Sequence, residues 1–557
     1  MKKHVKIIAL VLVLLTVLSC FAGCIEKPTK PQAPENSGSG LPLQDAKAVI
    51  EFTYTEAEFD DIKEKLLEIE AFALQNDDIE EIKKLEEELD GMIDHLHSQT
   101  SVASVLSYND TTDTEAEETY NRMTEWYNDI VVLYHKTYRK LYDSAPAKEE
   151  IFEDWTEYEI EYMFKDVETI AEYVDRFSEL SHTANMLDEE EVEEEIADIL
   201  KEMISLGNLI ADEMGYDNYF DYANEQEYSR DYNKEDIKAF RRLVKDNLVD
   251  NVDELIAVSY DKLSSLSNVE MMKVYNLLYE SPNKFKTDYI AGYIDSHSGT
   301  TKTYLNHAFE NENFMLGGEN AASVAFCTYI SDNNTPFMFF AKDRYTATTF
   351  VHELGHYYAS LFNEGMTGIM DVNEIQSQAN EMLFMNYLLE NFEDEKVIDA
   401  AYTYYIYEMV VTVIAATIIN DFEERIYTCG DVSGFTVEDF DNIMSEVLEE
   451  YGGEEFVSTY IFDAKLYWKM VVAQNPMYYI SYATSGVAAL SIMAIGTKDT
   501  EKAYGIYKVL CEEIDSESKY VETLRKLEIE TPFTQKGFKG ICDLIEIATE
   551  QDPSNVA

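Results

Sequence analysis

The sequence predicts a large, mainly α-helical protein that contains one small β-sheet. Four of its ten prolines lie within residues 25–45, so the rest of the chain has few helix-breaking residues. Apolar side chains recur at three- and four-residue steps over most of the first 270 residues, which is the helical period. Near residue 313 the period changes, and two short apolar runs separated by turn residues indicate a β-hairpin.

The composition is that of a globular protein with a strongly acidic surface. The chain has 557 residues, of which 46% are apolar and 27% charged, and Asp plus Glu number 109 against 43 Lys plus Arg. The resulting formal net charge of -66 repels phosphate backbones, which excludes nucleic-acid binding. Neutral or cationic partners are therefore expected.

The N-terminus has the pattern of a secretory leader. Three lysines among the first six residues precede an apolar run over residues 7–18, which is too short to span a bilayer. The run leads to small residues before Cys24, a pattern that resembles the lipobox of bacterial lipoproteins. We predict a signal peptide over residues 1–23, a lipidated Cys24 and a Pro/Ser/Gly-rich tether over 24–45. The expected location is the outer face of the bacterial cytoplasmic membrane, and the alternative is an ordinary cleaved signal peptide with a chance cysteine.

Residues 46–312 are predicted to form an N-terminal helical lobe. The clearest pattern covers residues 56–97, where apolar residues define one helical face. They are Phe59, Ile62, Leu66, Ile69 and Phe72, followed by Ile79, Ile82, Leu85, Leu89 and Ile93. The pattern recurs over 115–145, 151–180, 188–214 and 234–265. The charged residues between them are expected to be solvated faces without a specific function.

Residues 313–548 are predicted to form a second region that contains the hairpin and the chemically distinctive segment, followed by a tail at 549–557. The apolar runs Ala321–Ile330 and Pro336–Ala341 predict the two strands of the hairpin. A helix is expected to begin at about Thr346 and to carry His352, Glu353 and His356.

These three residues form a His-Glu-x-x-His pattern. Histidines four residues apart lie within about 40° on one face of a helix, so both imidazoles can reach one ion. Glu353 lies one step around the helix, where its carboxylate can take a proton from a metal-bound water. Zinc is the expected ion, but it requires a third protein ligand.

Spacing alone leaves that third ligand open. A metzincin would have a histidine six residues after His356, where this chain has Phe362. A thermolysin-like enzyme would use Asn373-Glu374 together with an aspartate at position 378, which is Gln378 here, and a later histidine, which is absent from the sequence.

Two glutamates downstream offer another arrangement. Glu374 and Glu381 are seven residues apart and so share one face of a helix. Glu374 can then bind the ion, while Glu381 accepts a hydrogen bond from a ligating imidazole. The alternative is that both are ordinary surface glutamates.

The helix motif and residues 371–381 together resemble the thimet oligopeptidase and oligoendopeptidase F family of zinc peptidases. The segment is similar to the family's Asp-x-x-Glu-x-Pro-Ser-Gln-x-x-Glu pattern, with Gln376 in place of the usual proline. Shorter similarities occur at 215–219, 230–232, 318–341 and 531–533, so the resemblance covers roughly residues 190–545. It implies a large two-lobed helical peptidase with a deep central channel and a small β-sheet beside the zinc helix. It also implies one Zn²⁺ per chain, bound by His352, His356 and Glu374.

The same resemblance implies roles for a tyrosine-rich segment and for the hairpin. Tyr482 is the first candidate to donate a hydrogen bond to the oxyanion, and Tyr479 is the second. Tyr478 and Tyr479 are also expected to contact substrate, although most of the chain's 40 tyrosines must be packing residues. The strand carrying Ala325 and Phe326 is expected to bind extended substrate by edge pairing.

One position departs from the family pattern. A histidine expected about ten residues before the tyrosine is replaced by Val471, Val472 and Ala473, so a second oxyanion donor is missing. Removal of such a donor typically costs about 2.7–4 kcal/mol of transition-state stabilisation.

Together these features predict an extracytoplasmic, lipid-anchored zinc metalloendopeptidase that cleaves internal bonds of oligopeptides. Glu353 is expected to activate the attacking water. The first alternative is a peptide-binding lipoprotein with little or no catalytic activity on the same scaffold. The second is a dipeptidyl carboxypeptidase, which would need a cation to bind the C-terminal carboxylate of its substrate. The sequence does not predict the oligomeric state.

Overall fold

The computed structural model describes residues 50–153, 155–187, 189–279, 284–310, 313–333, 335–363, 369–453, 457, 469, 472–473, 476–514 and 518–549. The predicted signal peptide, Cys24 and the tether lie outside the described residues, as do Val471 and all of the predicted tail beyond residue 549.

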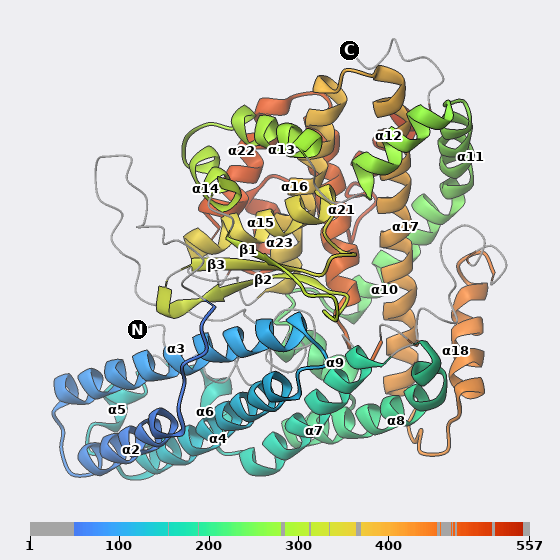
Figure 1. The fold of residues 1–557 in the computed structure, drawn as a ribbon. Coiled ribbons are helices and arrows are strands. Elements are labelled where there is room, and N and C mark those ends of the chain that lie inside the picture. Colours follow the sequence, from blue (N-terminus) through green and yellow to red (C-terminus); the bar gives the residue numbers. More distant parts are fainter. Residues whose placement is uncertain are drawn as a thin grey trace.

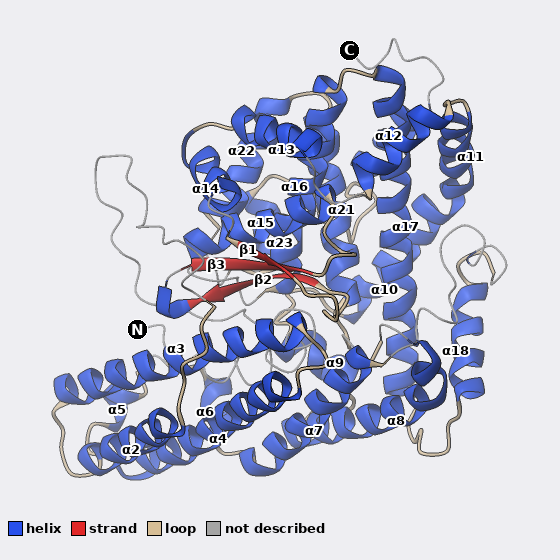
Figure 2. Ribbon diagram, in the orientation of Figure 1, coloured by secondary structure: helices blue, strands red, loops and turns tan. Residues whose placement is uncertain are grey.

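The predicted mainly helical fold is confirmed. Of the residues that the structure describes, 75% are helical, and a small three-stranded sheet lies among them. In Figure 1 the N-terminal helices form a lower layer, and most later elements form a larger body above it, with the sheet between the two. Figure 2 shows the strands surrounded by helices.

The lower layer forms where the sequence has amphipathic periodicity. It consists of α2 (Glu56–Ala73), α3 (Ile79–Asn109), α4 (Thr114–Ser144), α5 (Lys148–Ile151), α6 (Glu157–Met163), α7 (Val167–Met186) and α8 (Glu189–Met214). A capping box between Thr55 and Glu58 begins α2, and the side chain of Asp78 caps α3. Four of the five apolar residues predicted for the first face are buried, whereas Phe72 is half-buried. The single pattern over 151–180 is divided between α5, α6 and α7, because Asp166 caps a new helix.

The middle of the chain joins the lower layer to the upper body. Its elements are α9 (Tyr219–Tyr222), η2 (Ala223–Glu227), α10 (Lys234–Val244), η3 (Lys245–Val249), α11 (Asp250–Ser264), α12 (Asn268–Leu278), α13 (Lys284–Ser296) and α14 (Gly299–Glu310). Helices α11 and α12 pack on α17 (Glu395–Thr428), and α14 packs on α15 (Ala347–Asn363). Thus α11, α12 and α14 pack directly on elements of the later region.

The hairpin forms as predicted, and the sheet has one further strand. Strands β2 (Ala325–Ile330) and β3 (Thr335–Phe340) are antiparallel, with Ala325 opposite Phe340, and the 3-10 turn η4 (Ser331–Asn333) connects them. Strand β1 (Phe314–Leu316) pairs in parallel with β3, so the order is β1-β3-β2 and β2 is an edge strand. Helix α15 packs against β2 and β3, which places the sheet beside the helix that carries the histidines.

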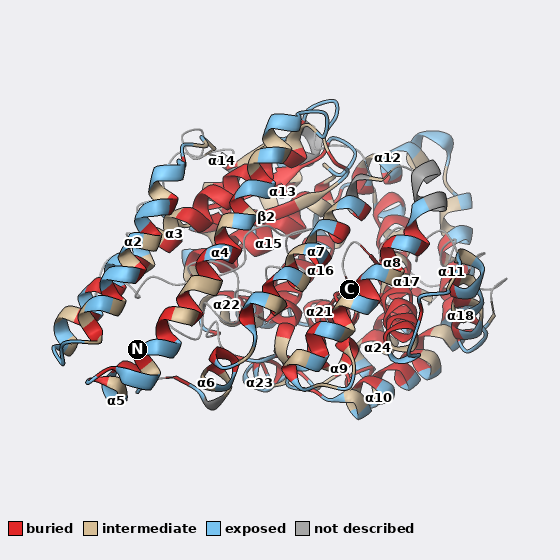
Figure 3. Cartoon of the chain, turned by 90° about the horizontal axis from the view of Figure 1, so that it is seen from below, coloured by how far each residue is buried: buried red, intermediate tan, exposed pale blue. Residues whose placement is uncertain are grey.

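The core of the upper body is built from long buried helices. Helix α16 (Met370–Asn391) packs on both α15 and α21 (Tyr479–Gly496). The remaining helices are α18 (Val437–Glu449), α22 (Thr500–Glu512), α23 (Tyr520–Lys526) and α24 (Lys539–Thr549). Figure 3 shows the lower helices with both exposed and buried residues, whereas α15, α16 and α21 are almost entirely buried.

Two helices, α17 and α21, are long and apolar enough to cross a membrane by length and composition alone. In each, 78% of the apolar window is buried inside the protein, which is the pattern of a core helix.

Candidate metal centre

The histidine helix is positioned by a cap and by one close contact with its neighbour. The Thr346 hydroxyl accepts a hydrogen bond from the backbone N–H of Thr349 at 3.1 Å, as a residue preceding a helix commonly does. At Gly355 the backbone of α16 approaches so closely that a Cβ atom there would lie 2.6 Å from the Gln376 carbonyl oxygen. The glycine between the two histidines therefore lets α15 and α16 bring their side chains together.

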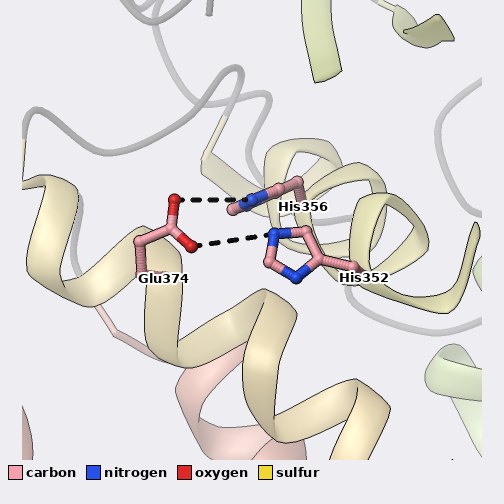
Figure 4. A group of neighbouring side chains, drawn as sticks. All are labelled: His352, His356 and Glu374. Carbon is pink, nitrogen blue, oxygen red and sulfur yellow. Dashed lines mark ion pairs between the residues drawn. The ribbon is translucent and has the colours of Figure 1, made fainter. Parts of the chain in front are cut away.

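The structure brings His352, His356 and Glu374 into one buried group (Figure 4). One donor atom from each residue lies within 4.8 Å of the other two. The Nε2 atom of His352 is 3.7 Å from Glu374 Oε2, and Nε2 of His356 is 3.9 Å from Glu374 Oε1. Figure 4 shows both imidazoles from α15 pointing toward the carboxylate on α16.

This donor set fits a zinc ion. Tetrahedral zinc with bonds of about 2.1 Å separates its donor atoms by about 3.4 Å, close to the two observed distances. Two imidazoles and one carboxylate form a common ligand set for catalytic zinc and leave one position for water or substrate. The predicted third ligand is therefore placed where it can complete the site.

The two glutamates predicted to share a helical face both point toward α15. Glu381 Oε1 lies 2.7 Å from His352 Nδ1, and the Tyr405 hydroxyl donates to the other carboxylate oxygen, Oε2, at 3.2 Å. This contact orients the imidazole so that Nε2 faces Glu374. The placement of Glu381 is the one predicted for it, whereas Tyr405 had no signal in the sequence beyond being one of many tyrosines.

Glu374 is held by two hydroxyl groups. The Tyr478 hydroxyl donates to Oε1 at 2.7 Å, and the Ser377 hydroxyl donates to Oε2 at 3.2 Å. Tyr478 was expected to contact substrate, but in the structure its hydroxyl is directed at the candidate metal ligand. The sequence does not reveal this contact, because the two residues are 104 positions apart.

Burial and neighbouring charges strongly perturb the ionisation of the group. Burial opposes the charged form of His352, but the hydrogen bond that its imidazole donates to Glu381 and the charges of the nearby carboxylates outweigh it and raise the pKa to about 9. Burial raises the pKa of Glu353 to about 8 and also raises that of Glu374. Burial, and then the charge on His352, lowers the pKa of His356 well below its ordinary value. A divalent cation would favour ionised carboxylates and neutral imidazoles, so metal binding at this site would release the protons that the group holds without a metal.

The side chain of Glu353 lies in the same buried region as the two histidines. It is buried, and its Oε2 atom has no hydrogen-bond partner among the described residues. A buried carboxylate oxygen without a partner is costly, which is typical of a group kept ready for chemistry.

The remaining predicted residues take different positions. The ring of Tyr482 is half-buried and lies 6.3 Å from the His352 ring, between centroids, with an interplanar angle of 29°. Tyr479 is half-buried and makes an edge contact with the Tyr478 ring. Phe326 is fully buried and stacks on Phe339, so the structure leaves it no surface for the predicted contact with substrate. Ala325, at the start of the same strand, is half-buried.

The position of the missing family histidine is apolar. Val472 and Ala473 are both buried. Neither side chain can donate a hydrogen bond to an oxyanion.

Comparisons with known proteins agree on the fold. No family model and no curated protein matches the sequence. Among solved structures, PZ peptidase A with an inhibitor superposes with a TM-score of 0.71 at 15% identity, covering 90% of this chain and 100% of that one. A protein assigned as an oligoendopeptidase F of Bacillus anthracis gives 0.72 at 17%, covering 92% and 99%. Oligoendopeptidase F of Enterococcus faecium gives 0.56 at 15%, covering 89% and 97%. The chain therefore has the fold of PZ peptidase A and oligoendopeptidase F over nearly its whole described length, as the motif resemblance implied.

Proposed function

We propose that this protein is a zinc metallo-oligopeptidase of the oligoendopeptidase type, which hydrolyses internal bonds of short peptides. The observation that carries the proposal is the buried group of His352, His356 and Glu374, together with Glu353 Oε2, which has no hydrogen-bond partner in the part of the chain that the structure describes. A metal site that only stabilises a fold needs no such carboxylate, whereas activation of water does. The fold shared with oligoendopeptidase F supports a peptide as the substrate.

The chain's own side chains divide the chemistry between them. When bound, zinc lowers the pKa of a water molecule and polarises the scissile carbonyl. Glu353 takes the proton from the attacking water and delivers it to the leaving amine. Its side chain is buried beside the two histidines, where it can carry the proton between the two transfers. The Tyr482 hydroxyl is the proposed donor to the oxyanion, and the half-buried Ala325 at the start of β2 is the proposed contact for extended substrate.

Peptide cleavage followed by mass spectrometry tests this proposal. A mixed oligopeptide pool is incubated with zinc-loaded protein (residues 25–557) and with its Glu353→Gln variant. The matched control is Glu438→Gln, which makes the same change at an exposed position on α18. We expect Glu353→Gln to reduce cleavage by about 10²–10⁴ while zinc content is unchanged, and the control to cleave normally. Equal cleavage by all three proteins would refute the assigned role of Glu353.

A second outcome would identify the peptide-binding alternative. Val472 and Ala473 supply no donor in place of the family histidine, which favours a weak or inactive enzyme. If the wild-type protein binds zinc and peptides but cleaves none, the protein is a peptide receptor on a peptidase fold. If it cleaves only two residues from the C-terminus, it is a dipeptidyl carboxypeptidase.

We also propose that a lipid on Cys24 anchors the protein to the outer face of the bacterial cytoplasmic membrane. The leader pattern supports this location. A Cys24→Ala variant should leave the membrane fraction and lose incorporation of a labelled fatty acid. Retention of both would overturn the proposed anchor.

A further inference from the structure

A buried ion pair lies next to the candidate metal centre and belongs to none of the predicted ligands. Arg230 Nε is 3.4 Å from Asp371 Oδ2, and neither side chain has any exposed surface. Asp371 is in the first turn of α16, three residues before Glu374. The free-energy cost of desolvating the two charges offsets much of their attraction, so a stabilising role alone is a weak explanation for the pair.

The Arg230 guanidinium holds the turn that precedes α21. Its Nη2 donates to the Met477 carbonyl oxygen at 2.8 Å and to the Ser481 hydroxyl oxygen at 2.7 Å. Its Nη1 donates to Asn224 Oδ1 at 2.6 Å. The planar guanidinium therefore fixes the direction of this turn through several bonds, which a lysine cannot reproduce.

The Asp371 carboxylate accepts hydrogen bonds from two segments of the chain. It accepts hydrogen bonds from the hydroxyls of Tyr232 at 2.7 Å, Ser481 at 2.8 Å and Thr484 at 2.8 Å, in addition to its contact with Arg230. Tyr232 follows η2, whereas the other two hydroxyls belong to the start of α21. One carboxylate on α16 thus fixes the position of α21 relative to the metal ligand on the same helix.

The turn held in this way is strained. Met477 has a φ of 64°, a left-handed conformation that costs energy in a residue with a side chain. Its N–H donates to Glu423 Oε1 at 2.7 Å, and the Tyr228 hydroxyl donates to the Pro476 carbonyl oxygen at 2.9 Å. The next residue is Tyr478, whose hydroxyl reaches Glu374.

We propose that the Arg230–Asp371 pair is a positioning device for the tyrosine segment. It holds the turn over residues 476–478 and the first turn of α21 in register with α16. In that register the Tyr478 hydroxyl holds the metal-binding carboxylate, and Tyr482 is held beside the His352 ring. The effect on catalysis rests on the proposed peptidase function, but the effect on the metal site does not.

A double-mutant cycle on zinc affinity tests the proposal without requiring activity. Arg230→Lys keeps the charge but loses the bonds to the turn, and Tyr478→Phe removes the hydroxyl that holds Glu374. If the pair acts through Tyr478, Arg230→Lys should weaken zinc binding by about tenfold, since loss of groups that orient a metal ligand typically costs 10–100-fold. Tyr478→Phe should then add less than twofold in the Arg230→Lys background. Fully additive losses, or no loss with Arg230→Lys, would overturn the proposal.

Matched variants separate positioning from general destabilisation. Arg241 is another buried arginine, and its hydrogen bonds go to Asn420 and Glu424 rather than to the turn over residues 476–478. Arg241→Lys should lower the melting temperature without changing zinc affinity. If Arg230→Lys does not fold, Ser481→Ala provides a milder test, because it removes the hydroxyl that bridges Arg230 and Asp371. It should weaken zinc binding by a few-fold, and an unchanged zinc affinity would count against the proposal.

Peptidase activity provides the second readout, measured at saturating zinc. Arg230→Lys should lower kcat by about 10–100-fold with KM changed by less than about threefold, because the loss concerns groups that act in the transition state. Tyr482→Phe should lower kcat by about 10²–10³ in the wild type but by less than tenfold in Arg230→Lys. An undiminished effect of Tyr482→Phe would overturn the positioning role in catalysis. A wild-type protein that cleaves nothing would refute the proposed function, while the zinc cycle would still decide the positioning role.

Discussion

Replacing Gly355 by alanine should separate the two helices that carry the candidate metal ligands. This glycine lies between the two histidines of α15, at its crossing with α16. An added Cβ would lie 2.6 Å from the Gln376 carbonyl oxygen and 2.8 Å from the Ser377 Cα. Both obstacles are backbone atoms inside a helix, so neither can rotate away, and the helices themselves must move.

The required movement can be worked out from these distances. Ordinary contact begins at 3.4 Å, so relieving the 2.6 Å contact needs a displacement of about 0.8 Å (3.4 minus 2.6). The distances from Glu374 to His352 and His356 are already 3.7 and 3.9 Å. Because zinc–ligand bonds tolerate only about 0.2 Å of variation, we expect zinc affinity to fall at least tenfold. Overpacking should also lower the free energy of unfolding by about 1–3 kcal/mol, while the better helix propensity of alanine returns about 1 kcal/mol.

Zinc affinity by chelator competition and stability by denaturant unfolding provide the assay. The control is Gly505→Ala on α22, where an added Cβ meets nothing within 4 Å. That variant should gain up to about 1 kcal/mol and bind zinc normally. If Gly355→Ala matched this control in both measurements, the close approach of the helices would not control the geometry of the site.

Three other variants test separate features of the structure. Glu381→Ala removes the carboxylate that orients the His352 imidazole, so zinc affinity should fall about 10–100-fold in a chelator titration. An unchanged zinc affinity would show that packing alone orients the imidazole. Burial raises the pKa of Glu423 to about 8, so the folded protein keeps a proton that the unfolded chain releases near pH 4.5. As the pH rises between these two values, the free energy of unfolding should therefore fall by up to about 1.4 kcal/mol per pH unit. Glu423→Gln should remove this slope in unfolding curves recorded from pH 5 to 8, and identical slopes would contradict the assignment. Burial lowers the pKa of the His135 imidazole to about 3, so as the pH falls below about 6.5 the unfolded chain binds a proton at this residue before the folded protein does. Between pH 6 and 4 the free energy of unfolding of the wild type should therefore drop more steeply than that of His135→Leu.

Much of the candidate site follows from local periodicity. The spacing of the two histidines and that of Glu374 and Glu381 place each pair on one face of a helix, whatever the helix packs against. The hairpin and the amphipathic helices of the lower layer are also local patterns, and the structure contains them. Strand β1 has only three residues, and it pairs with β3 across a gap of more than twenty positions, so no local pattern marks it.

The contacts that arrange the site have no local pattern. Arg230 and Asp371 are 141 positions apart, and Tyr478 and Glu374 are 104 apart. The burial of Phe326 also has no local pattern. Alternation along a strand predicts that the strand has two faces, but it does not predict which face packs on the core.

The sequence by itself determined that His352 and His356 share one helical face with Glu353 one step away, because helical period and side-chain chemistry are properties of short segments. It left the third ligand open, and Glu374 was expected in that role only from the family resemblance. Only the tertiary structure decided that Tyr478 holds the candidate ligand, that Tyr405 supports Glu381, and that a buried ion pair holds the tyrosine turn. The physical reason is that a hydrogen bond is set by distance and direction in space. Many tyrosines and arginines in this chain could supply the same donors, and packing selects among them.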